Sequence, residues 1–171
     1  ATARSISYNL NFPAAFPSVP QVALVLAGID VDYRAAGVSL EVTSVTRTNF
    51  TYQIRVPAGA RLSAVKLYWL ATVSTSINVG YFKQTNPQVA DIGVPTISGS
   101  VTFSRSLSGQ VNAVPFISGF YFRNNSAARL TAEVNGLSPN SASLDIFVNA
   151  NNRPSYVNIA VIHYRTTDRK S

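Results

Sequence analysis

Alternation of apolar and polar residues in short runs is the feature of this 171-residue sequence that most limits its fold. The runs are rich in Val, Ile, Thr, Tyr and Phe, and clusters of Gly, Pro, Asn and Ser separate them, as is typical of antiparallel strands joined by turns. The runs that we expect to form strands are residues 22–32, 38–45, 51–56, 62–72, 101–107, 116–122, 129–137, 142–148 and 156–164. The sequence therefore predicts an all-β protein, an antiparallel β-sandwich of about a dozen short strands.

The composition limits the class of protein further. Because 46% of the residues are hydrophobic and only 12% are charged, we expect a folded chain with a real core. No apolar run approaches the ~18 residues that a membrane-spanning helix needs. The absence of cysteine excludes disulfides, thiolate metal sites and cysteine nucleophiles. The compartment is left open, with a secreted or cell-surface location favoured over the cytoplasm, and Asn49 and Asn124 fit the glycosylation sequon.

The sequence repeats itself at a constant shift of 92 positions. Residues 38–46 align with residues 130–138, and residues 61–69 align with residues 153–161. We interpret this as a tandem duplication, with a first copy at 1–75, a linker at 76–97 and a second copy at 98–171. The linker is inferred from its Asn, Gly and Pro residues. Each copy is small for an independent sandwich, so we expect the two copies, or several chains, to bury surface together.

Four elements of the first copy occur in the order and spacing of a known family. They are Phe12, the alternating run at 20–32, the turn "SVTRTNF" at 44–50 and a last strand with tryptophan at 65–71. In these elements the first copy resembles the H-type lectin domain, the family of the snail agglutinins and of the carboxy-terminal part of the discoidins. The resemblance implies a six-stranded antiparallel sandwich in each copy and assembly as a trimer. It also implies binding of galactose or N-acetylgalactosamine between subunits, without a metal or other cofactor.

The family's sugar-binding residues are an arginine, a Trp-His pair and a tyrosine. The resemblance places the arginine at Gly37, the Trp-His pair at Pro57 and Ala58, and the tyrosine at Ser63, so this site of the first copy looks emptied.

The second copy keeps polar groups at the matching positions. The arginine position is Arg129, and the loop that replaces the Trp-His pair is rich in amides. Planar amide and guanidinium groups can each engage two sugar hydroxyls, and an aromatic ring can cover the apolar face of a sugar. The predicted ligand-binding residues are therefore Arg129, Asn149, Asn151, Asn152, Arg153 and Tyr156. The alternative is that residues 149–153 are only a polar hairpin loop, since Asn is common in turns.

Several other residues have a structural and a functional interpretation. For Trp69, the only tryptophan, we expect core packing rather than ligand stacking. For His163, the only histidine, we expect a place in the core or in an interface rather than general base catalysis, because no nucleophile motif lies near it. Asp30 and Asp32 share a strand face but are expected to be solvated edge charges rather than calcium ligands.

Three functions remain open at this stage. Because the seven carboxylates form no paired acidic motif, we expect no catalysis. The leading hypothesis is a lectin for galactose or N-acetylgalactosamine-type glycans that forms a homo-oligomer, with a trimer favoured. The alternative is a structural subunit of a capsid, sheath or fibre. A net charge of +7 from scattered basic residues makes weak polyanion binding a third possibility.

Overall fold

The computed structural model describes residues 2–31, 35–87, 95–123, 128–149 and 153–166. Among these residues all regular structure is strand, and each strand pairing is antiparallel. The strands are β1 (Arg4–Asn11), β2 (Gln21–Val31), β3 (Ala36–Val45), β4 (Asn49–Val56), β5 (Leu62–Thr72), β6 (Ile77–Thr85), β7 (Thr96–Thr102), β8 (Val111–Phe122), β9 (Leu130–Ser138), β10 (Ser141–Val148) and β11 (Tyr156–Arg165). The predicted all-β antiparallel class is confirmed. Over the described ranges no helix is long and apolar enough to cross a membrane.

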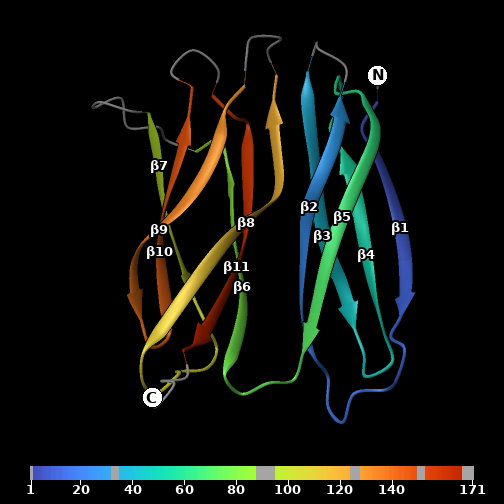
Figure 1. The fold of residues 1–171 in the computed structure, drawn as a ribbon. Coiled ribbons are helices and arrows are strands. Elements are labelled where there is room, and N and C mark those ends of the chain that lie inside the picture. Colours follow the sequence, from blue (N-terminus) through green and yellow to red (C-terminus); the bar gives the residue numbers. More distant parts are fainter. Residues whose placement is uncertain (1, 32–34, 88–94, 124–127, 150–152, 167–171) are drawn as a thin grey trace.

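The strands form three sheets. The largest has the order β1-β4-β3-β8-β11-β6, and the others have the orders β7-β10-β9 and β2-β5. We call β1 to β5 the first half of the chain and β6 to β11 the second half. The two halves lie side by side in Figure 1, the first on the right and the second on the left. They are joined where the start of β3 pairs with the end of β8, over only four residues of β3, Ala36 to Ser39.

The same pairing scheme occurs in both halves. In the first half β1-β4-β3 packs against β2-β5, and in the second half β7-β10-β9 packs against β8 and β11. This correspondence supports the predicted duplication, which stays a prediction together with its boundaries. Two separate cores result. One lies around Leu24, Leu40 and Phe50, and the other lies around Leu144 and Ile159.

Strand β6 lies inside the segment that the sequence predicted to be a linker. Residues 77–85 pair with β11 along their whole length, so this stretch of the predicted linker is a strand rather than a loop. The Tyr81 hydroxyl donates a hydrogen bond to the Val22 carbonyl at 2.8 Å and accepts one from the Leu24 amide at 3.0 Å, which ties β6 to β2. The Asn, Gly and Pro residues around β6 suggested a loop because they dominate turns, but a paired edge strand tolerates them.

Further strand predictions differ from the structure, among them the start of β8, which is Val111 rather than residue 116. Strand β1 was not among the predicted runs, and β7 covers Thr96–Thr102 rather than residues 101–107. The apolar residues that suggested a strand there, Phe103 and Leu107, are buried core anchors on a loop. Their amides donate to the carbonyls of Asn140 and Pro139, both at 2.8 Å.

The core prediction for Trp69 holds only in part. Its ring lies 5.9 Å from the Phe12 ring and 5.5 Å from the Phe50 ring, centroid to centroid, yet the residue is 38% exposed. The reason is that β5, which carries Trp69, pairs with only one of the described strands, β2. Asp30 is exposed, as predicted, whereas Asp32 lies outside the described residues. Within the described ranges, no cluster of three His, Cys, Asp or Glu side chains could hold a metal.

The core prediction for His163 is confirmed, since the residue is completely buried. Its Nδ1 accepts from the Asn78 side-chain amide at 3.2 Å, so Nε2 carries the proton and donates to the Ser138 carbonyl at 3.1 Å. The Phe103 ring stacks on the imidazole with centroids 4.5 Å apart. Burial lowers the pKa of His163, and this outweighs the bond to Ser138, which acts in the opposite direction.

Candidate functional site

The structure separates the predicted sugar-binding residues into two groups. Arg129 is exposed and directly precedes β9, and Asn149 directly follows β10. Because Leu130 pairs with Val148, Arg129 and Asn149 lie at the same end of the neighbouring strands β9 and β10. Arg153 is exposed in the connection between β10 and β11, whereas Asn151 and Asn152 lie outside the described residues.

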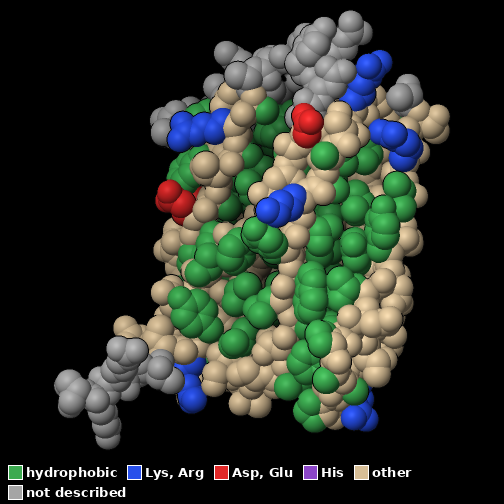
Figure 2. Space-filling view, turned by 45° about the vertical axis from the view of Figure 1, so that its right-hand side comes forward, with side chains coloured by type: hydrophobic (Ala, Val, Ile, Leu, Met, Phe, Trp, Pro, Cys, Tyr) green, Lys and Arg blue, Asp and Glu red, His purple; other side chains and the backbone are tan. Residues whose placement is uncertain are grey.

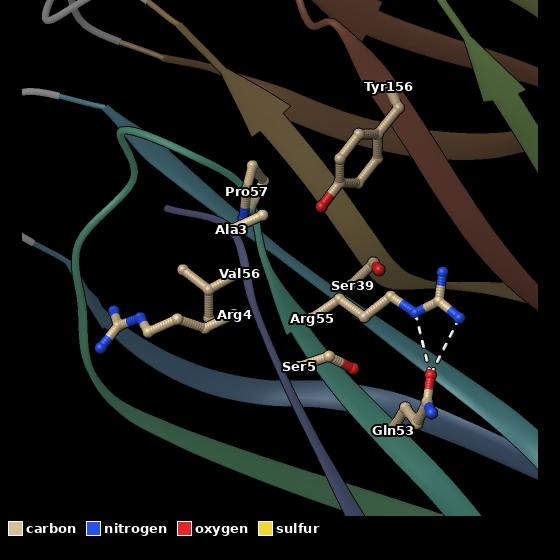
Figure 3. A pocket seen from close by; sticks show the side chains of 9 residues that line it. All are labelled: Ala3, Arg4, Ser5, Ser39, Gln53, Arg55, Val56, Pro57 and Tyr156. Atoms are coloured by element: carbon tan, nitrogen blue, oxygen red, sulfur yellow. Dashed lines mark hydrogen bonds between the residues drawn. The ribbon is translucent and has the colours of Figure 1, made fainter. Parts of the chain in front are cut away.

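Tyr156 belongs to a different place. It opens β11, opposite Tyr121 of β8 and Thr85 of β6, and lines a groove whose other walls come from the first half. Figure 3 shows its ring pointing toward Pro57 and Ser39. Neither Arg129, Asn149 nor Arg153 lines this groove.

We call this hollow the seam groove, because it lies on the large sheet where the two halves join. Its main part has a volume of about 570 Å³ and is lined by Ala3, Arg4, Ser5, Ser39, Gln53, Arg55, Val56, Pro57 and Tyr156. A smaller hollow of about 220 Å³ shares three of these residues and is lined by Ser39, Glu41, Arg55, Lys83, Gln84, Thr85, Tyr156 and Asn158. Together they bring β1, β4, β3, β11 and β6 to one surface.

Strand register explains why polar side chains gather here. Residues that pair across an antiparallel sheet point to the same face. One row of paired positions crosses all six strands of the large sheet, and its members are Ser5, Arg55, Ser39, Gly119, Asn158 and Lys83. The neighbouring pair of Glu41 and Gln53 adds two more polar side chains.

Gly119 at the centre of this row allows the two halves to approach closely. A Cβ atom at this position would lie 2.8 Å from the Ser39 Cβ and 3.0 Å from the Asn158 Nδ2. No larger residue fits without moving backbone or side chains. The small residue therefore sets the spacing between Ser39 of the first half and Asn158 of the second.

Three charged side chains of the seam groove, those of Arg55, Glu41 and Lys83, are held in a network. Nε and Nη2 of Arg55 donate to the Gln53 Oε1 at 3.0 and 2.9 Å. Nη2 also lies 3.1 Å from a Glu41 carboxylate oxygen, whose second oxygen lies 3.6 Å from the Lys83 Nζ. The Arg55 side chain is still 54% exposed. It is thus oriented before any ligand arrives and keeps donors facing solvent.

Tyr156 supplies a neutral phenol to the groove. Burial raises the pKa of Tyr156 to about 12, the hydrogen bond with Ser39 acts in the opposite direction, and the nearby Tyr121 also raises it. The hydroxyl therefore stays protonated at physiological pH and can both donate and accept a hydrogen bond.

Tyr121 packs against the first-half residues that the family resemblance places at sugar-binding positions, Gly37 and Ala58 among them. A Cβ atom on Gly37 would lie 2.6 Å from the Tyr121 Cδ2 and 3.0 Å from the Pro57 Cγ. The Tyr121 hydroxyl donates to the Ala58 carbonyl at 2.8 Å. A side chain of the second half thus packs on this part of the first half, while Ser63 lines a different groove.

Sequence reasoning missed most of the seam groove. The outward polar positions of β3 and β4, among them Glu41, Gln53 and Arg55, were visible as alternation within the predicted strands. Nothing in the sequence indicated that β3 pairs with β8. Lys83 lay in the segment that was predicted to be a linker, so its place beside Asn158 could not be expected.

Comparisons with known proteins give one family match. Residues 7–72 match the H-type lectin domain, which covers one of the two predicted copies. No curated protein and no solved structure shows significant similarity to the chain. The match covers β2 to β5 and most of β1, the strands that supply the first-half wall of the seam groove. The first half therefore resembles an H-type lectin domain, and this match suggests that the protein binds carbohydrate.

Proposed function

We propose that this protein is a lectin that binds glycans in the seam groove without catalysis. The observation that carries the proposal is the groove itself, with guanidinium, amide, hydroxyl and aromatic groups converging on about 570 Å³ beside the lectin-like strands. Sugars are held by such planar donors and acceptors together with an aromatic surface. The match to the H-type lectin domain does not favour the alternative of a structural subunit.

Each wall of the groove has a distinct role in this proposal. Arg55, already oriented by Gln53 and Glu41, donates to sugar hydroxyls with its remaining N–H groups. Tyr156 offers its ring to the apolar side of a sugar and its hydroxyl to a neighbouring oxygen. Asn158, on the far side of Gly119, adds an amide that can both donate and accept.

The groove chemistry suits binding rather than glycoside hydrolysis. Hydrolysis needs two placed carboxyl groups, one of which is an acid at the working pH. Glu41 is the one carboxylate among the described lining residues, and it lies against Arg55 and Lys83. H-type lectin domains are generally non-catalytic, which agrees with this chemistry.

The sugar class follows from the family resemblance. We propose galactose and N-acetylgalactosamine-type glycans, with a trimer as the assembly that the resemblance implies. The loop end that holds Arg129, Asn149 and Arg153 is a second proposed contact, which a longer glycan could use.

A glycan array of neutral and acidic sugars tests the function. We expect binding to terminal galactose or N-acetylgalactosamine, and loss of that binding in Tyr156→Ala. Arg47→Ala is the matched control, because Arg47 lies away from the groove, where its Nε donates to the Phe16 carbonyl. An array without any signal would contradict the proposal.

A salt titration separates sugar recognition from binding to polyanions. Phosphate- or sulfate-dominated binding weakens steeply as salt rises, whereas binding of a neutral sugar hardly changes. We expect a flat salt dependence, and a steep one would favour the net charge of +7 as the cause of binding.

A further inference from the structure

The seam groove has two compartments whose linings differ in chemistry. We call the hollow of about 570 Å³ the stacking compartment, because Val56, Pro57 and the Tyr156 ring give it apolar surface. We call the hollow of about 220 Å³ the polar compartment, because each of its eight lining residues carries a polar side chain. Ser39, Arg55 and Tyr156 line both hollows, so the two compartments adjoin.

The polar compartment is built mainly by the second half of the chain. Strands β6 and β11 supply five of its eight lining residues. Lys83 pairs with Asn158, and Thr85 pairs with Tyr156, so these four side chains point to the same face of the sheet. The family match ends at residue 72, so most of this compartment lies outside the H-type lectin domain.

The polar compartment offers donors and acceptors to a ligand. Thr85 is exposed and Asn158 is half-buried, and neither side chain makes a hydrogen bond to another residue in the described part of the chain. The Lys83 Nζ lies 3.6 Å from a Glu41 carboxylate oxygen, which is longer than a good hydrogen bond. A sugar hydroxyl both donates and accepts, so it can bond to any of these groups.

This concentration of polar groups is not typical of the whole surface. The side turned forward in Figure 2, which belongs mainly to the first half, shows broad bands of hydrophobic side chains with few charged ones among them. A ligand rich in hydroxyl groups finds more hydrogen-bonding partners in the seam groove than on such a surface.

Arg55 lies between the two compartments. Figure 3 shows its side chain running across the groove toward Gln53, whereas Arg4 points the other way. Because Arg55 lines both hollows and its guanidinium has several N–H groups, it can donate to two neighbouring rings of one ligand.

The length of the groove exceeds what one sugar ring covers. Neighbouring strands lie about 4.8 Å apart, so the row of paired positions from Ser5 on β1 to Lys83 on β6 extends over roughly 24 Å. Clefts of about 300 to 1,000 Å³ hold drug-sized ligands, which are larger than a single hexose. A ring stacked on Tyr156 in the larger compartment therefore leaves the polar compartment free for a second ring.

We propose that the seam groove binds at least two linked sugar units, one in the stacking compartment and the next in the polar compartment. The inference rests on the proposed lectin function and deepens it, since it names an oligosaccharide rather than a single sugar as the ligand. The first unit lays its apolar face on Tyr156. The second unit is held by hydrogen bonds from β6 and β11, so the second half of the chain selects the extension.

Titration calorimetry on the full chain tests the proposal. The probes are galactose, N-acetylgalactosamine and neutral disaccharides that contain one of them at either end. We expect the best disaccharide to bind about tenfold more tightly than its monosaccharide. The double variant Lys83→Ala/Thr85→Val should reduce this gain to about twofold or less and leave the affinity for the monosaccharide unchanged. Both side chains are exposed, so the variant should fold.

The matched control is Lys66→Ala/Thr102→Val. It makes the same change of charge and volume at two exposed strand residues that line neither compartment. Lys66 also lies over a tyrosine ring as Lys83 does, at 5.5 Å from the Tyr68 centroid against 5.6 Å for Lys83 and Tyr81. The control should keep the full gain from the second sugar unit.

Saturation-transfer NMR locates the second unit independently. We expect protons of both rings of the disaccharide to receive saturation from the protein, and the second ring to lose it in Lys83→Ala/Thr85→Val. Equal affinities for monosaccharide and disaccharide, or a gain that survives in this variant, would overturn the two-unit site and leave the lectin function standing. Absence of binding for all of these sugars would overturn both.

Discussion

The two halves of this protein share one strand-pairing scheme and differ in how they close it. In the second half β6 lies beside β11, and the inward residues of β7 are buried. In the first half none of the described strands lies beside β5 in this way, and Ile6 and Tyr8 of β1 stay exposed. The comparison shows that an inward-facing side chain at the edge of a sheet is buried only where another strand covers it. One extra strand separates a closed sandwich from an open one.

The strongest test of this difference between the halves is a pair of matched substitutions on β1 and β7. Ile97→Ala should destabilise the protein by about 2 to 5 kcal/mol, because it removes a fully buried side chain. Ile6→Ala should cost less than about 1 kcal/mol in dilute solution, because Ile6 is already 54% exposed. Urea unfolding of both variants measures the difference. Equal costs would show that a partner or another segment buries Ile6.

The seam between the halves is tested by adding one methyl group. Gly37→Ala should destabilise by about 1 to 3 kcal/mol, because the new Cβ would lie 2.6 Å from the Tyr121 ring. Gly28→Ala is the control, since its Cβ would meet only the Lys66 Cβ at an ordinary 3.7 Å. Thermal unfolding should separate the two variants. A Gly37→Ala protein as stable as the control would mean that Tyr121 does not pack there.

A smaller effect concerns pH and the core of the second half. Because burial lowers the pKa of His163 in the folded state, the unfolded chain binds more protons as the pH falls below about 6.5. Stability should therefore fall between about pH 6.5 and 5, by no more than about 1.4 kcal/mol per pH unit for this single group. Urea unfolding across this range should show the slope, and His163→Gln should remove it. A slope that persists in the variant would assign it to other groups.

The fold class and much of the first half could be predicted from the sequence, because alternation fixes which side of a strand faces the core. Phe50 and Leu24 are buried as their pattern indicates. The sequence could not show that β3 pairs with β8, since strand pairing depends on contacts far apart in the chain. For that reason Ser39 and Arg55 were not among the predicted ligand-binding residues, whereas Tyr156 was, together with loop residues that do not line the seam groove.

The loop near residue 150 shows a second limit of prediction from the sequence. Amides and arginine near residue 150 fit a sugar site and a polar turn equally well, because both use the same side chains. Lys83 shows how turn residues mislead, since Asn, Gly and Pro around β6 concealed a strand that pairs with β11.

Titration calorimetry on Arg55→Ala and Arg129→Ala, with the best sugar from the array, tests the central claim most directly. Arg55→Ala should weaken binding by about tenfold or more, because a hydrogen bond to a charged group is worth about 1.5 to 3 kcal/mol. Its stability should hardly change, since the side chain is 54% exposed. Arg129→Ala, outside the seam groove, should stay within a factor of about three for a single sugar unit. If Arg129→Ala abolishes binding and Arg55→Ala binds normally, the sugar is held by the loop end of the second half and the seam groove is not the site.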